Sequence, residues 1–221
     1  TNQTRNHTNT LSYSDIDEIL DNSADLERVI IKGGEPLYDK KTLYYLENLE
    51  KINSTVELNI ITNFTVYNEK LISKFPNLNL TLSIDGINDT YEYIRGGNFD
   101  VIKENFIKVS KLNRVSYIHF TLSAYNLHQA QQTRDFFGDI SSKYNNENNY
   151  RFILNIAHNN HLRAGHISED KYIKAKENQS VLKNIPNYSK PTDPQIQRFI
   201  TYTSYLDSIR GFSWHDIEKI Y

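Results

Sequence analysis

The chain has 221 residues, of which 38% are hydrophobic and 12% aromatic, so it can bury one sizeable core and is too apolar to be disordered throughout. The formal net charge of −2 argues against a general polyanion binder, because nucleic-acid affinity depends mainly on neutralised phosphates. Neither a long apolar run that could span a membrane nor a signal peptide is visible. We therefore expect a cytoplasmic protein whose partners include no membrane and no nucleic acid.

Helices and strands alternate from residue 13 to residue 156. The predicted elements are, in chain order, a helix at 13–20, a buried strand at 29–31, a helix from Asp39 to 52, a strand at 56–61, a helix at 68–75, a strand at 78–84, a helix from Asp100 to 112, a strand at 115–122, a helix from Asn126 to 137 and a strand at 152–156. The polar stretch at 141–149 predicts a solvated loop. Such alternation is typical of βα units around a parallel sheet.

The pattern changes after residue 157. Residues 158–195 are polar and rich in proline, and they predict a loop, a lid or an irregular insertion. Asp193 and Pro194 then open a helix that stops at Gly211, and Ser213 opens a last short helix. We therefore divide the chain into a core at 1–157, an insertion at 158–195 and a helical C-terminal segment at 196–221 that packs on the core.

The chain opens on a helix, which predicts that a first strand lies upstream of Thr1. With that strand the βα units would number about six, so the expected fold is α/β, a partial (β/α)6 TIM-like barrel with a helical C-terminal segment. A doubly wound open sheet is the alternative. The chain also lacks methionine, so we expect a fragment of a longer protein, or modified residues missing from the sequence.

Small, hydrogen-bonding residues follow each of the first four predicted strands. Ligands of parallel α/β sheets bind beyond the carboxyl ends of the strands, so these residues are the binding candidates. They are Gly33, Gly34, Glu35, Pro36, Thr62, Asn63, Ser83, Asp85, Ser123 and Asn126. The glycine pair lets the backbone approach a ligand closely and adopt positive φ. The ordinary alternative is that these are turn and cap residues.

Three of these strand ends resemble a known family. The Gly-Gly-Glu-Pro motif at 33–36 resembles the GGEP motif of radical S-adenosylmethionine (radical SAM) enzymes, and Thr-Asn at 62–63 stands where the family often has Thr-Asn-Gly. Ser-Ile-Asp-Gly at 83–86, followed by Arg95, resembles the family's Ser-x-Asp-Gly strand end and downstream arginine. The tail at 205–211 resembles the C-terminal end of twitch domain-containing radical SAM proteins.

The resemblance implies a partial barrel that binds S-adenosylmethionine together with a [4Fe-4S] cluster. A CxxxCxxC loop after the first strand holds that cluster in the family. A reductant such as flavodoxin or ferredoxin supplies the electron, and the resulting 5′-deoxyadenosyl radical abstracts hydrogen from a substrate. For this chain a peptide or protein substrate is favoured over a small metabolite.

Site roles follow from the resemblance by position. Gly33, Gly34 and Glu35 would hold the methionyl amino group of S-adenosylmethionine. Thr62 and Asn63 would line the floor of the site.

The later strand ends would complete the site. Ser83 and Asp85 would face the ribose or the methionyl part, and Arg95 would pair with the carboxylate through a charge-assisted bond. Ser123 and Asn126 would form the wall near the ribose or adenine. The sequence assigns no catalytic residue and no metal ligand.

The chain departs from the family in one large respect, because it contains no cysteine. These 221 residues therefore offer no thiolate for an iron–sulfur cluster, and by themselves they cannot perform radical chemistry. We expect the cluster loop upstream of Thr1. Two alternatives stay open: a cluster-less relative that keeps the barrel as a binding or scaffold module, and an unrelated α/β protein.

Basic residues follow the last predicted strand. His158, His161 and His166 have a spacing that would suit a zinc site, but no thiolate accompanies them, and we expect solvated loop histidines. Arg163 and His166 also suggest a second role, the steering of an anionic substrate.

Overall fold

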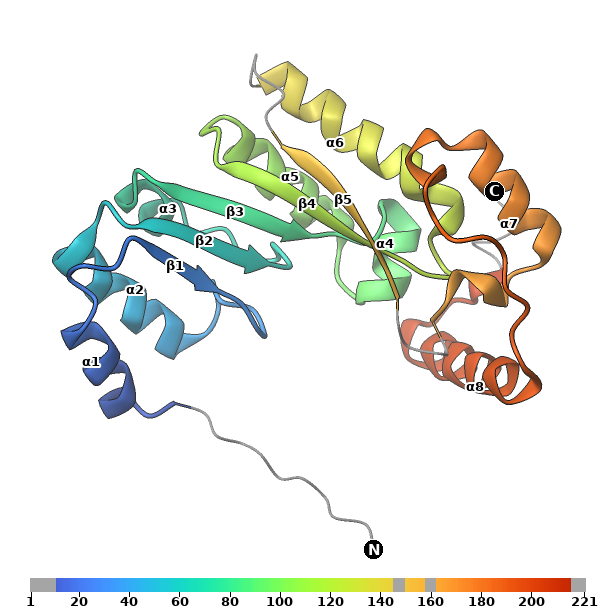
Figure 1. The fold of residues 1–221 in the computed structure, drawn as a ribbon, viewed down its shortest axis with the longest axis horizontal. Coiled ribbons are helices and arrows are strands. Elements are labelled where there is room, and N and C mark those ends of the chain that lie inside the picture. The colour runs from blue at the N-terminus through green and yellow to red at the C-terminus, as the bar shows by residue number, and fades with distance from the viewer. Residues whose placement is uncertain (1–10, 145–149, 158–161, 216–221) are drawn as a thin grey trace, which may run out of the picture. The chain divides into compact units, whose positions relative to one another are not determined.

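The computed structural model describes residues 11–144, 150–157 and 162–215. The chain divides into two compact units. Unit 1 comprises residues 1–62 and 66–79, and unit 2 comprises residues 63–65 and 80–221. Five strands form one parallel sheet with the order β1-β2-β3-β4-β5 (Figure 1). This confirms the predicted α/β fold with successive parallel strands.

The elements of unit 1 are α1 (Tyr13–Asp21), β1 (Arg28–Ile31), α2 (Lys40–Asn53), β2 (Glu57–Thr62), α3 (Glu69–Lys74) and the start of β3 (Leu78–Ser83). Those of unit 2 are the rest of β3, α4 (Asn88–Arg95), α5 (Phe99–Ser110), β4 (Val115–Leu122), η1 (Leu127–Gln129), α6 (Ala130–Tyr144), β5 (Arg151–Ile156), η2 (Ala164–His166), α7 (Glu169–Asn178), η3 (Ser180–Leu182) and α8 (Asp193–Arg210).

Polar caps start the helices of unit 1. At α1, the Ser12 hydroxyl accepts from the backbone N–H of Asp15 at 3.1 Å, and the Asp15 carboxylate accepts from the Ser12 N–H at 2.6 Å. This reciprocal pair satisfies N–H groups that a helix start leaves open. The Asp39 carboxylate likewise accepts from the N–H of Thr42 at 2.7 Å, and these bonds lower the pKa of Asp39. Both predicted helices are confirmed.

Strand β1 is exposed on one side, where the sequence predicts burial. It pairs in parallel with β2 alone, with Val29 opposite Leu58, and it stands at one end of the strand order. Ile30 is 58% exposed, whereas Val29 and Ile31 on the other face are half-buried. A β-branched run favours a strand, but whether its side chains are buried depends on what covers each face of the sheet. The prediction of a buried strand was therefore wrong.

Unit 2 builds its main core between the sheet and two helices. Phe106 of α5 and Phe137 of α6 are fully buried, and their ring centroids lie 4.7 Å apart. Figure 1 shows α5 and α6 running side by side along β4. On β4, Ile118, Phe120 and Leu122 are buried, with the half-buried His119 and Thr121 between them, as the alternation of a strand requires.

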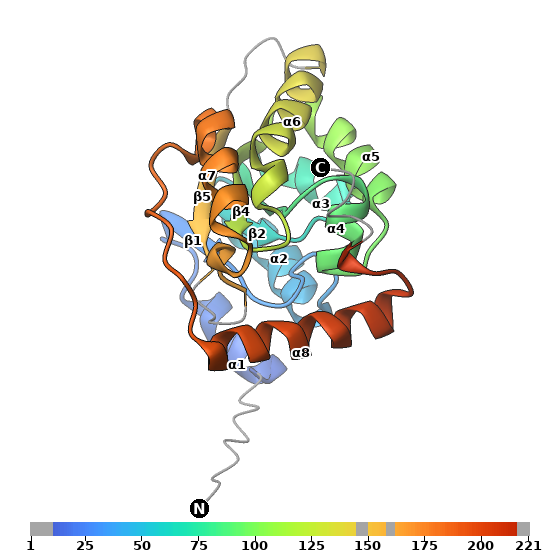
Figure 2. The same cartoon turned by 90° about the vertical axis from the view of Figure 1, so that its right-hand side faces the viewer.

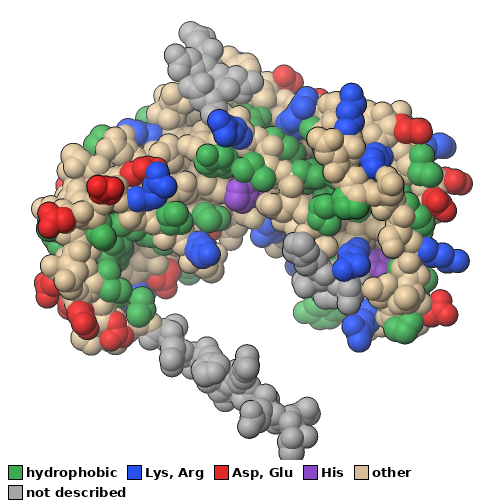
Figure 3. Space-filling view, viewed as in Figure 1, with side chains coloured by type: hydrophobic (Ala, Val, Ile, Leu, Met, Phe, Trp, Pro, Cys, Tyr) green, Lys and Arg blue, Asp and Glu red, His purple; other side chains and the backbone are tan. Residues whose placement is uncertain are grey.

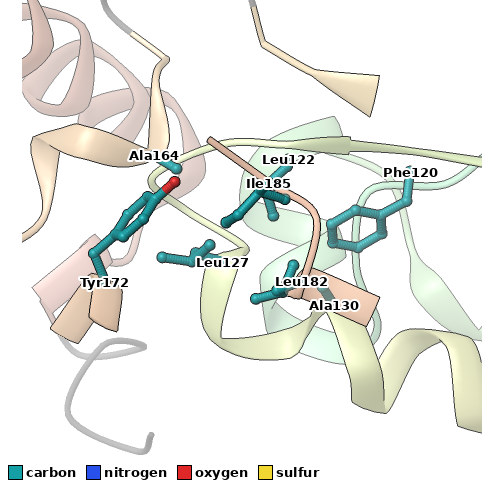
Figure 4. Close-up of a cluster of buried hydrophobic side chains, with 8 residues drawn as sticks. All are labelled: Phe120, Leu122, Leu127, Ala130, Ala164, Tyr172, Leu182 and Ile185. Atoms are coloured by element: carbon teal, nitrogen blue, oxygen red, sulfur yellow. The ribbon is translucent and has the colours of Figure 1, made fainter. Parts of the chain in front are cut away.

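A second cluster lies around the carboxyl half of β4. It joins β4, the η1 turn, α6 and the segment from η2 to residue 185, and Figure 4 shows its side chains. The backbones of β4, α6 and α7 can be followed in Figure 2. Its buried members are Phe120, Leu122, Leu127, Ala130, Ala164, Tyr172, Leu182 and Ile185. The chain after β5 is therefore packed against the sheet of unit 2.

Helix α8 is tied to α4 by a buried polar centre. The Tyr93 hydroxyl donates to Asp207 Oδ1 at 2.7 Å, and the backbone N–H of Trp214 donates to the same oxygen at 3.0 Å. Arg210 Nε donates to the Tyr93 carbonyl at 2.9 Å. Burial, and secondarily the Asp207 carboxylate, raise the pKa of Tyr93 well above its ordinary value, so the hydroxyl remains a donor.

Several predicted boundaries need correction. No helix was predicted at α4, although Gly96 ends it in the left-handed conformation, with φ 71°. Helix α5 is capped by Asn98, whose side chain accepts from the N–H of Asp100, and not by Asp100 itself.

Two polar stretches also contain more helix than the sequence predicts. Helix α6 continues to Tyr144 instead of ending near 137, and Ser141 extends its buried face, one turn after Phe137. Helix α7 lies inside the predicted irregular region at 158–195, anchored by the buried Tyr172. Part of the predicted loop at 141–149 and part of the predicted last helix at 213–221 lie outside the described residues.

Charges of both signs mix on the surface of each unit. On the face drawn in Figure 3, Lys and Arg side chains stand among Asp and Glu in both units, in keeping with the net charge of −2. Within the described ranges, the helices include none with the length and apolar character needed to cross a membrane.

We predict that Tyr93→Phe lowers the free energy of unfolding of unit 2 by about 1–3 kcal/mol, because Oδ1 of the half-buried Asp207 loses one of its two donors. Urea unfolding followed by the fluorescence of Trp214, the only tryptophan, measures this, since its ring lies 5.6 Å from that of Tyr93. Tyr205→Phe is the matched control on α8, where the side chain is 57% exposed and a change within about 0.5 kcal/mol is expected. Equal losses in the two variants would contradict the prediction.

Candidate functional site

The loop after β1 offers an open stretch of backbone. Gly33 and Gly34 have φ angles of +109° and +52°, a region that other residues rarely adopt. A Cβ built on either glycine would meet nothing within 4 Å, so there is room for another group beside this backbone. The two glycines border a hollow of about 720 Å³ between α1, α2 and β1, lined also by Ile30 and Tyr38.

Glu35 fixes the shape of this loop. Its Oε1 accepts from the hydroxyl of Thr62 at 2.6 Å and from the backbone N–H of Leu37 at 3.1 Å. Thr62 is buried at the end of β2, and Pro36 is buried after Glu35. Unit 1 therefore brings together five of the predicted site residues, with the carboxylate of Glu35 joining the ends of β1 and β2.

Asn63 belongs to unit 2 and closes a turn. Its side-chain oxygen accepts from the N–H of Thr65 at 3.0 Å and from the hydroxyl of the same residue at 2.8 Å. The next residue, Phe64, has a φ of 63° and is fully buried, and its carbonyl accepts from Asn105 at 3.0 Å. These contacts give Asn63 the role of a turn residue.

Asp85 is the centre of the site in unit 2. Its Oδ2 lies 2.6 Å from Nη2 of Arg95, and the same Nη2 donates to the hydroxyl of Ser83 at 2.8 Å. Its Oδ1 accepts from the backbone N–H of Thr121 at 2.8 Å. The Asp85 side chain is 9% exposed and that of Arg95 30%, so the guanidinium keeps a face toward solvent.

Asn126 joins the ends of β3 and β4. Its amide nitrogen donates to the carbonyl of Asp85 at 3.0 Å and to that of Thr121 at 2.9 Å. Its oxygen accepts from the N–H of Ser123 at 2.7 Å. The side chain is fully buried, so it serves as a brace between two loops rather than as a helix cap.

Gln129 also belongs to this site, although it is not among the residues predicted from the sequence. Its side-chain oxygen accepts from the N–H of Ile87 at 2.9 Å and lies 3.0 Å from where a Cβ on Gly86 would stand. Gly86 has a φ of +150°, so the turn after β3 depends on glycine. The only signal was its position three residues after Asn126.

The histidines form no metal site within the described part of the chain, where the groups of His, Asp and Glu include none suited to hold a metal ion. His166 stacks on Phe199, with ring centroids 4.9 Å apart and planes 4° apart. His158 and His161 lie outside the described residues.

The sequence and the fold of the chain were each compared with known proteins. The family model described as Radical SAM superfamily matches residues 1–137. None of the curated proteins matches the chain.

Among solved structures, the fold is similar to that of SuiB from Streptococcus suis, with a TM-score of 0.54 and 15% sequence identity over 92% of this chain. SuiB bound to S-adenosylmethionine gives a TM-score of 0.52 and 16% identity, again over 92% of this chain. The chain spans only 42% and 40% of those two chains. At these identities the likeness shows the fold alone. The sequence match is what establishes the family: because it extends over residues 1–137 of 221, the chain belongs to the Radical SAM superfamily.

Proposed function

We propose that this chain is the S-adenosylmethionine-binding barrel portion of a radical SAM enzyme. The observation that carries the proposal is the open Gly33–Glu35 backbone at the carboxyl end of β1, in a chain of this superfamily. Bound S-adenosylmethionine supplies an adenosyl group, and the enzyme would use it to remove hydrogen from a substrate.

The functional groups of the site residues suit the binding of S-adenosylmethionine. The carbonyl groups beside Gly33 and Gly34 would accept from the methionyl ammonium, and the open space beside both glycines leaves room for it. Glu35 would add a negative charge while its bonds to Thr62 and Leu37 keep the loop in place. In unit 2, Arg95 is aimed by Asp85 and Ser83 and presents a partly exposed guanidinium, which suits the methionyl carboxylate.

The residues do not fit the iron–sulfur cluster. The chain has no cysteine, and its described residues include no cluster of His, Asp and Glu that could replace thiolates. The cluster ligands of the proposed enzyme must therefore come from polypeptide outside these 221 residues. The resemblance to twitch domain-containing members, the reductant and a peptide or protein substrate belong to the same proposal.

A second candidate function has one observation in its favour, the absence of cysteine. In that case the barrel is a cluster-less module that binds a nucleoside or peptide as a scaffold. The two candidates differ in whether the natural protein carries closely spaced cysteines upstream of Thr1.

We expect Glu35→Ala to weaken the binding of S-adenosylmethionine about 10- to 100-fold, the loss of one charge-assisted hydrogen bond, while the chain stays folded. Isothermal titration of the chain with S-adenosylmethionine measures the affinity, and thermal unfolding measures the stability. Glu47→Ala is the matched control, because Glu47 is exposed on α2, and it should leave both quantities unchanged. Arg95→Gln should weaken binding as well, and it should also lower stability, because the buried Asp85 carboxylate loses its cation. If neither variant bound S-adenosylmethionine more weakly than Glu47→Ala does, the proposal would be rejected.

We also expect that anaerobic treatment of the chain with iron, sulfide and a reductant leaves no cluster after desalting, because thiolates are absent. Iron and sulfide assays with visible absorption spectra measure this. A superfamily member that has its cluster cysteines, treated in parallel, is the positive control. One cluster per chain would show that other side chains replace the thiolates and would overturn the division of roles proposed above.

A further inference from the structure

A pocket of about 320 Å³ lies beyond the carboxyl ends of β4 and β5, wholly within unit 2. Leu122 and Ile156 end the two strands and form its inner wall. The remaining lining comes from residues 157–195, all of which follow the stretch that matches the family model. The pocket is therefore a feature of this chain's own C-terminal part.

The floor of the pocket is apolar. Ala164, Tyr172 and Ile185 belong to the buried cluster around β4, and Figure 4 shows them gathered beside Leu122. Ala157 adds a further apolar contact. A ligand that enters must therefore bring an apolar part to cover this surface.

The rim of the pocket is cationic. Arg163, His166 and Lys190 line it, and no Asp or Glu is among its lining residues. Arg163 and Lys190 are exposed, and neither side chain makes an ion pair with the described residues. His166 is held in place by its stack on Phe199 of α8. The rim thus presents two positive charges that no described carboxylate neutralises.

The shape of the pocket is fixed by bonds on its outer side. The Tyr172 hydroxyl donates to the carbonyl of Pro186 at 2.7 Å, and Lys176 Nζ donates to that of Ile185 at 2.9 Å. A Cβ on Gly165 would lie 2.8 Å from the Ser189 carbonyl, so the two walls approach as closely as glycine allows. A pocket held in this way loses little freedom when a ligand binds.

From the apolar floor and the cationic rim we infer that this pocket binds a carboxylate carried on a short apolar stem. The identification of this ligand as a substrate rests on the proposed function. Under that function, the carboxylate belongs to a peptide substrate. Either the C-terminal residue or an acidic side chain would supply it. The stem lies on Leu122, Ala164 and Ile185, and the carboxylate faces Arg163 and Lys190.

Amide NMR spectra of the full chain, recorded without S-adenosylmethionine, test the inference with three small probes. N-acetyl-L-leucine carries a C-terminal carboxylate, N-acetyl-L-glutamic acid α-amide a side-chain carboxylate, and N-acetyl-L-leucinamide none. At least one of the two acids should shift the amides of Ala157, Ala164 and Gly165 in a saturable manner, and the neutral amide should not. The stronger acid identifies the source of the carboxylate.

Variants separate the pocket from general charge effects. Arg163→Gln with Lys190→Gln should weaken binding of the stronger acid about fivefold, as expected for two exposed charge contacts. Lys183→Gln removes an exposed lysine of the same segment that lies outside the pocket lining, and it should leave binding unchanged. Glu35→Ala should also leave it unchanged, so failure of the S-adenosylmethionine proposal would be seen separately.

Three results would overturn the inference. They are equal shifts from the neutral amide and the acids, a loss in Lys183→Gln as large as in the double variant, and stronger binding of inorganic phosphate than of either acid. The last would point to a phosphate site instead. The inference would also be overturned if neither acid gave a saturable shift of these amides.

Discussion

The carboxylate of Asp85 is the contact on which the ordered site of unit 2 depends. One oxygen accepts from the backbone of β4 at Thr121, and the other holds Arg95 at the end of α4. A single buried side chain thus fixes a strand end, a neighbouring strand and a helix at once. Its cost of burial is offset because both oxygens are bonded, one of them to a cation. Asn126 repeats the arrangement with neutral groups, joining the carbonyls of Asp85 and Thr121.

Most of the fold could be read from the sequence, because β4 alternates and β1 is a short β-branched run ended by two glycines. The strand-end candidates were also within reach, since parallel topology sends them to one edge of a sheet. Helix α4 was not, because Tyr93 is buried through Asp207, 114 positions away in the chain. Exposure of Ile30 and the role of Gln129 likewise depend on distant neighbours, which a local pattern does not contain.

The side chains of this sequence suit one of the two chemical tasks of the proposed enzyme, the binding of its ligand. The chain's own residues offer carbonyls, carboxylates and a guanidinium, which are hard, hydrogen-bonding groups suited to an amino acid moiety. It offers no sulfur ligand at all, since both cysteine and methionine are absent. In the proposed enzyme, ligand recognition and electron supply would therefore rest on different stretches of polypeptide.

Within the described residues, β1 stands at the end of the sheet, at the edge where the strand expected upstream of Thr1 would pair. A parallel strand with one open side is a template for pairing with another strand, and the exposed Ile30 adds an apolar centre. Basic residues flank that centre, Arg28 on one side and Lys32 on the other. Antiparallel pairing of two copies about Ile30 would set Arg28 of one, which is ion-paired with Glu57 at 2.8 Å, against Lys32 of the next, and facing like charges weaken such a ladder. If left uncovered, this edge is therefore a poor partner for a second copy of itself.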